Sequence, residues 1–220
     1  MSDHAIDASA ALAAPDPLRE PWVDLDRQRQ AATLGMWLFL MSEMLFFGAV
    51  FMAFSFSRAL NVAAFEAAAR ETEIAYGAMN TAVIVTSSLT ITLALRAAKI
   101  ADRNLAGRLL AQTAFLGAVF LVIKGFEYRD DLEHHLYPTF GFALGENAAE
   151  IFWAFYWIMT GLHAIHLAVG VGLVSRLAWL VRRRRMSLQS PQIEVTSLYW
   201  HLVDAFWLLV FPVLYIMGRG

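Results

Sequence analysis

The chain has 220 residues, of which 59% are hydrophobic and 16% charged, and its mean hydropathy is +0.52. A soluble domain of this length is not so apolar, so the composition predicts an integral membrane protein. The net charge of −2 indicates no class of partner, and the absence of cysteine excludes disulfides, thiolate metal sites and a cysteine nucleophile.

Residues 1–30 are polar and contain six acidic residues. They have neither a basic start nor an apolar core, so they do not resemble a secretory signal peptide. We expect them to form a polar cytoplasmic tail, and residues 31–220 to form the transmembrane domain.

Five apolar stretches follow the tail, and each is long enough to cross about 30 Å of hydrocarbon as a helix. The sequence therefore predicts an all-α, polytopic membrane protein, a bundle of five transmembrane helices. They are expected near residues 31–57, 76–98, 106–128, 150–180 and 197–217.

Lys and Arg residues are distributed unequally between the two ends of these helices. Twelve of the 17 fall in the tail, between the second and third helices, or between the fourth and fifth, where Arg182, Arg183, Arg184 and Arg185 form a run. The positive-inside rule then places the N-terminus in the cytoplasm and the C-terminus outside. Because the run adjoins a membrane helix and has no interleaved aromatic residues, we interpret it as a lipid headgroup contact, with no nucleic acid as partner.

Glu43 lies near the middle of the first helix, in apolar surroundings that include Phe46 and Phe47. A carboxylate at this depth is costly, which makes a functional role the default hypothesis. It is expected either to handle protons in contact with lipid or a partner subunit, or to form an interhelical hydrogen bond that fixes packing. The two roles are compatible.

Polar side chains on the second helix recur at spacings of seven and four. Such a stripe of small polar residues is typical of close helix packing and is less suited to a channel, because it contains no ionisable group. The stripe consists of Asn80, Thr81, Ser87, Ser88 and Thr92.

On the third helix, Lys124 and Glu127 are three residues apart and are expected to pair. The acidic, histidine-containing segment that follows is expected to be a solvated loop, with a metal site at His134 and His135 as the alternative.

Histidines in the fourth and fifth helices raise the possibility of a di-iron or haem site. His163 and His166 are spaced i, i+3, and His201 and Asp204 repeat that spacing. Di-iron bundles instead repeat a Glu-x-x-His motif, which none of these helices contains. The expected depths of His163, His201 and Glu127 also differ, which favours separate interhelical polar contacts and no metal centre in this chain.

From about Gly35 to Gly218, the chain resembles subunit III of haem–copper terminal oxidases. The resemblance depends on an ordered set of motifs: Gly35 to Glu43, Asn80-Thr81 with Ser87-Ser88, Glu127-Tyr128, Thr160 to His166 with Gly170, and Tyr199 to Trp207. Each motif is weak alone, whereas the ordered set is specific.

The resemblance implies a multi-pass subunit of a proton-pumping cytochrome c oxidase in the bacterial inner membrane, serving aerobic respiration. Such a subunit holds no redox centre, since haem and copper belong to partner subunits I and II, and it contacts cytochrome c or quinol only indirectly. In the family, subunit III stabilises subunit I, binds phospholipid in a cleft and supports proton uptake. Glu43 matches the family's carboxylate beside that cleft, and the later motif residues are expected to hold the bundle together.

Longer members of the family have two further helices before the shared five, so this chain resembles the short bacterial form. The lipid cleft would then be closed by another subunit or by an extension of subunit I. Accessory subunits of quinol oxidases and nitric oxide reductases are the alternatives within the family, although Ser42-Glu43 resembles the cytochrome c oxidase form. Outside the family, an independent membrane metalloenzyme is the main alternative. A transporter is disfavoured because no inverted repeat occurs.

Overall fold

The computed structural model describes residues 24–138 and 147–217, and the secondary structure in these ranges is entirely helical. Five helices are long and apolar enough to cross a membrane, which confirms the predicted all-α bundle. The elements are α2 (Leu25–Leu60), α3 (Val62–Arg70), α4 (Ile74–Lys99), α5 (Arg103–Glu133), α6 (Asn147–Arg182), α7 (Pro191–Phe211) and the π-helical turn η1 (Pro212–Ile216).

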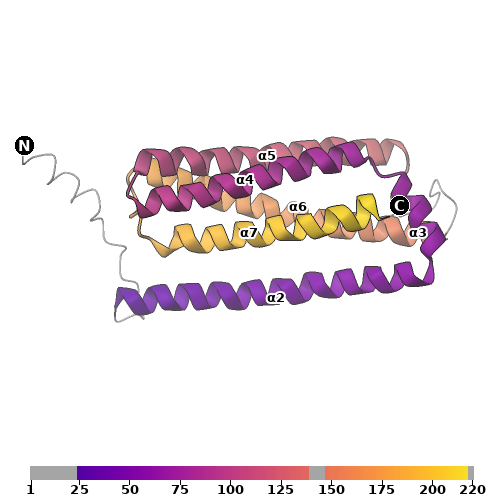
Figure 1. Cartoon of the computed structure of the whole chain (residues 1–220), viewed down its shortest axis with the longest axis horizontal. Coiled ribbons are helices and arrows are strands. Elements are labelled where there is room, and N and C mark those ends of the chain that lie inside the picture. Colours follow the sequence, from indigo (N-terminus) through magenta and orange to yellow (C-terminus); the bar gives the residue numbers. More distant parts are fainter. Residues whose placement is uncertain (1–23, 139–146, 218–220) are drawn as a thin grey trace, which may run out of the picture.

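Each of the five long helices runs antiparallel to the long helix before it in the chain (Figure 1). Helices α4, α5, α6 and α7 pack together, whereas α2 lies along one flank and contacts mainly α7 and α6. The short helix α3, which the sequence did not lead us to expect, lies at one end of the bundle. We call this the α3 end, and the opposite end, where α6 finishes at Arg182, the arginine end.

The helices extend beyond the apolar stretches from which they were predicted, because polar residues cap them. Helix α2 begins at Leu25, inside the expected tail, and Asp24 accepts a hydrogen bond from the Arg27 amide at its start. Asp102 caps α5 in the same way, and Ser190 caps α7. Such capping satisfies amides that the first turn of a helix leaves unpaired. Residues 1–23 of the predicted tail lie outside the described residues.

Small residues allow three helices to approach closely near the centre of the bundle. At Gly117 on α5, a Cβ atom would lie 2.7 Å from both the Trp200 ring and Val171. At Gly170 on α6, it would lie 3.2 Å from the same ring. Trp200 of α7 is fully buried in this contact, so the glycines accommodate one of the largest side chains in the shared core.

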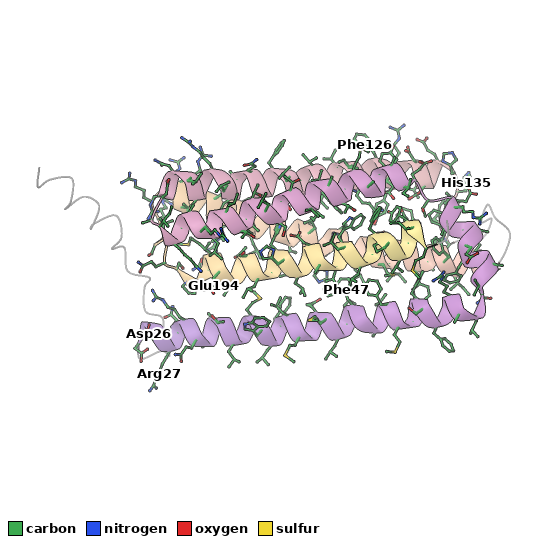
Figure 2. The ribbon with its side chains drawn as sticks, viewed as in Figure 1. Asp26, Arg27, Phe47, Phe126, His135 and Glu194 are labelled. Atoms are coloured by element: carbon green, nitrogen blue, oxygen red, sulfur yellow. The ribbon has the colours of Figure 1, made fainter. Side chains whose placement is uncertain are left out.

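Helix α2 is attached to the bundle mainly by aromatic side chains. Phe47 stacks on Phe206 of α7 with ring centroids 4.0 Å apart, and it points from α2 toward α7 (Figure 2). Phe54 contacts Phe65 of α3 and Phe152 of α6. Only 17% of the most apolar window of α2 is buried, against 50% in α7, so most of the α2 surface is left for lipid or another chain.

We predict that Gly117→Ala destabilises the protein by about 1–3 kcal/mol, because the added methyl group overpacks a site that Trp200 cannot leave. The matched control is Gly125→Ala on the same helix, where a Cβ atom meets nothing within 4 Å. Thermal unfolding of the purified chain in detergent measures both. Equal unfolding temperatures for the two variants would contradict the packing described here.

Candidate functional site

Glu43 of α2 faces His166 of α6, which gives the intramembrane carboxylate a partner. The Glu43 Oε2 and His166 Nε2 atoms are 3.1 Å apart, and both side chains are mostly buried, with exposed fractions of 17% and 22%. This contact joins the peripheral helix to the bundle. The expected interhelical hydrogen bond of Glu43 remains a prediction, because its buried Oε2 atom has no hydrogen-bond partner among the described residues.

The hydrogen bonding of His166 determines how protons are arranged at this contact. Its Nδ1 atom lies 2.7 Å from the carbonyl oxygen of Leu162. A carbonyl only accepts, so Nδ1 is the donor and Nε2 carries a proton only in the imidazolium form. The pair is therefore neutral overall when it holds one proton at the contact, either on Nε2 beside a carboxylate or on the carboxyl group beside a neutral imidazole.

A second polar site, the buried cluster, lies toward the α3 end and is centred on Lys124 of α5. The Lys124 Nζ atom is 3.0 Å from Glu127 Oε1, which confirms the predicted i, i+3 pair. It also donates to the hydroxyl oxygens of Tyr156 on α6, at 3.0 Å, and Tyr215 in η1, at 2.7 Å. All three protons of the ammonium group thus have acceptors, and Lys124 is only 2% exposed.

Asp131 completes the buried cluster. The Tyr156 hydroxyl lies 2.8 Å from Glu127 Oε1 and 2.7 Å from Asp131 Oδ2. A single hydroxyl proton cannot serve both contacts, so one carboxyl group must supply a proton of its own. Because Tyr215 also donates to Glu127 and Lys124 pairs with it, the protonated group is Asp131. The buried cluster then has no net charge.

Two local features of the backbone bring these side chains together. Helix α5 continues to Glu133, so the expectation of a solvated acidic loop after Tyr128 is wrong for residues 129–133. The additional helical turn directs Asp131 into the core. Pro212 begins η1, where the Met217 amide bonds to the Pro212 carbonyl oxygen. This wider i→i+5 turn directs Tyr215 toward Lys124.

The polar stripe on α4, which was expected to serve close helix packing, faces α7. Ser87 accepts a hydrogen bond from Trp200 Nε1 at 3.1 Å, and Thr81 accepts one from Trp207 Nε1 at 3.0 Å. Ser88 lies 3.0 Å from Nδ1 of His201. The stripe therefore provides partners for polar atoms of α7 that hydrocarbon would leave unpaired.

Three of the expected interhelical contacts are buried without hydrogen-bond partners among the described residues. They are those of Asn80, His163 and Asp204. The His163 ring packs against Phe120 and Trp207, at centroid distances of 5.3 and 5.1 Å. Asp204 lies 4.0 Å from His201. For Asn80 and His163, the expectation of a polar contact remains a prediction.

The histidines do not converge on a metal centre in the described part of the chain. His163 packs within the bundle and His166 faces α2, so this i, i+3 pair serves two different contacts. Within residues 24–138 and 147–217, no three His, Asp or Glu side chains are grouped as a metal ion would require. The alternative metal sites therefore have no ligand set in these ranges.

Arg182 to Arg185 lie at the arginine end and are exposed. The guanidinium group of Arg185 is 5.1 Å from the centre of the Trp179 ring. Polar side chains lie at both ends of the bundle (Figure 2): Asp26, Arg27 and Glu194 lie toward the arginine end, and His135 lies toward the α3 end.

Sequence reasoning missed Tyr156, Tyr215 and Asp131, which are three of the five residues of the buried cluster. Tyr156 is a tyrosine inside an apolar span, which signals a hydroxyl in need of a partner. No spacing rule connects it to Lys124, which is 32 positions earlier in the chain.

The arrangement defines a polytopic helical membrane protein that buries a charged cluster and exposes one helix. The family model for cytochrome c oxidase subunit III matches residues 27–219. The chain therefore belongs to the cytochrome c oxidase subunit III family.

Three relatives show the breadth of the family. Cytochrome c oxidase subunit 3 of Thermostichus vulcanus is 31% identical over 84% of this chain and 87% of its own length. Cytochrome bo(3) ubiquinol oxidase subunit 3 of Pseudomonas aeruginosa is 28% identical over 84% of both chains. A heme-copper oxidase subunit I+III of Aeropyrum pernix is 30% identical over 83% of this chain and 22% of its own length.

We predict that Glu127→Gln lowers the free energy of unfolding by about 3–5 kcal/mol, because it leaves Lys124 charged and without a counter-ion. Asp131→Asn is the matched variant. Its amide can donate to Tyr156 as a protonated carboxyl does, so we expect a change below about 1 kcal/mol. Thermal unfolding in detergent distinguishes the two. Comparable losses would mean that Asp131 is ionised.

Proposed function

We propose that this chain is the non-redox subunit III of a proton-pumping haem–copper oxidase, a cytochrome c oxidase of the bacterial inner membrane. The family match over residues 27–219 is the observation that carries the proposal. Haem and copper are then held by the partner subunits I and II. This chain contributes structural support, phospholipid binding and assistance to proton uptake.

Helix α2 is the surface that we assign to subunit I. It buries the smallest share of its most apolar window within the chain, and its exposed face carries large side chains such as Trp37 and Phe46. A relative whose name joins subunits I and III in one protein supports direct contact between the two. Phospholipid is expected beside this helix, where the family's lipid cleft would lie.

Glu43 and His166 are the residues that we assign to proton-uptake support. Their contact holds one proton in either of two neutral forms, so a proton can move between the two side chains without adding charge to the membrane interior. Glu43 lies on α2, the helix assigned to subunit I. A proton held here is therefore close to the subunit whose chemistry consumes it.

A quinol oxidase is the second candidate, because a relative of similar coverage has that name. We predict that the tagged chain, purified in mild detergent, brings with it the large oxidase subunits and haem visible in a reduced-minus-oxidised spectrum. Haem a favours the cytochrome c oxidase, and haem b without haem a favours the quinol oxidase or nitric oxide reductase. A chain that arrives alone with stoichiometric metal would overturn the proposal.

For Glu43→Gln, we predict an unchanged haem spectrum and subunit composition, loss of carbodiimide labelling, and slower proton uptake or a shorter lifetime under turnover. The amide keeps the shape of the side chain but cannot exchange a proton. The matched control is Glu194→Gln at the exposed start of α7, which should behave as the unmodified complex. Loss of haem from Glu43→Gln would show that Glu43 is structural instead.

A further inference from the structure

An open groove runs between α5 and α6, and no residue of α2 lines it. It has a volume of about 750 Å³. Its floor is made of small side chains, and its walls include the half-exposed rings of Phe115 and Trp179. The small residues are Ala111, Ala114 and Ala118 of α5 and Ser175 and Ala178 of α6.

The groove begins at the arginine end and stops partway along the bundle. Its lining extends from Arg183, directly after α6, back to Val171 of α6. At a rise of 1.5 Å per residue, this segment is about 18 Å long. This is close to half of the roughly 30 Å hydrocarbon layer. A groove of this length matches an acyl chain of one leaflet, whereas a transmembrane helix of a partner would need a surface that crosses both leaflets.

Positive charge is concentrated where the groove opens toward the headgroups. Arg182 and Arg183 line this opening. A Cβ atom at Gly107 would lie 2.8 Å from Cγ of Arg182, so the aliphatic part of the Arg182 side chain packs directly against α5. Trp179 holds the guanidinium group of Arg185 beside the same opening. Across residues 24–138 and 147–217, the ion pairs involve none of the four arginines Arg182 to Arg185.

We propose that the groove is a binding site for one anionic phospholipid, with an acyl chain on the alanine floor and the phosphate group between Arg182 and Arg183. Arginine pairs with phosphate through two parallel hydrogen bonds, and it lacks an acidic partner here. Trp179 lies at the level where aromatic rings meet headgroups. This site is separate from any lipid beside α2 and does not depend on the oxidase assignment.

The test uses native mass spectrometry of the full-length chain, with whatever subunits accompany it, in mild detergent. After partial delipidation, phosphatidylglycerol or phosphatidylcholine is added and the bound lipids are counted. We expect the unmodified protein to retain one phosphatidylglycerol. The double variant Arg182→Gln/Arg183→Gln should bind this lipid about thirtyfold more weakly, since each arginine near a headgroup contributes roughly 1 kcal/mol. Arg176→Gln, an exposed arginine on α6 outside the groove, is the control.

A second pair of variants tests the acyl chain. Ser175→Phe fills the groove from an exposed position, and Val169→Phe adds the same ring to an exposed position of α6 outside it. Ser175→Phe should lose the lipid and Val169→Phe should keep it. Loss of the lipid from the arginine double variant, with retention by Ser175→Phe, would indicate a site for phosphate alone and overturn the proposal. Equal retention of both lipids, or dissociation of a partner subunit from Ser175→Phe with the lipid count unchanged, would also overturn it.

Discussion

Hydrocarbon provides no water to a charged side chain, and the buried cluster around Lys124 is the protein's response to that constraint. The ammonium group takes one carboxylate from its own helix, one tyrosine from α6 and one from the turn after α7. Helix α5, helix α6 and the turn after α7 therefore each contribute a polar group that pairs with groups of the other two. The register of α5, α6 and α7 follows from this shared requirement, and the close contacts of Gly117 and Gly170 with Trp200 become possible only in that register.

Interactions within one helix were predictable from the sequence, and interactions between helices were not. Lys124 and Glu127 are three residues apart, and helical spacing alone pairs them. The polar stripe on α4 indicated close packing in the same way. Tyr215 reaches the buried cluster through a π-helical turn, and no pattern of residue types specifies that turn. Asp131 was assigned to a solvated loop because hydropathy falls where the helix in fact continues.

The partner of Glu43 illustrates the same limit. Its cost in the membrane made Glu43 a candidate functional residue, and His166 was predicted separately to make a polar contact. The sequence did not join them, because the position of α2 on the bundle depends on aromatic contacts between helices, such as that of Phe47 with Phe206 of α7. The protein thus combines a bundle held by buried charge with a peripheral helix held mainly by aromatic rings. The second arrangement is better suited to a surface that, as we propose, also contacts another subunit.

The spacing of Lys124 and Glu127 also affects how the chain enters the membrane during synthesis. Both residues belong to α5, which leaves the ribosome before α6 and α7 and therefore before either tyrosine of the buried cluster exists. Because their side chains meet at i, i+3 within one helix, they can neutralise each other as soon as that helix forms. A lone lysine adds about 2.5–3.5 kcal/mol to the cost of insertion at the centre of a helix, and less toward the end where Lys124 lies. The pair within α5 therefore lowers the cost of inserting this helix into the bilayer before α6 and α7 are present.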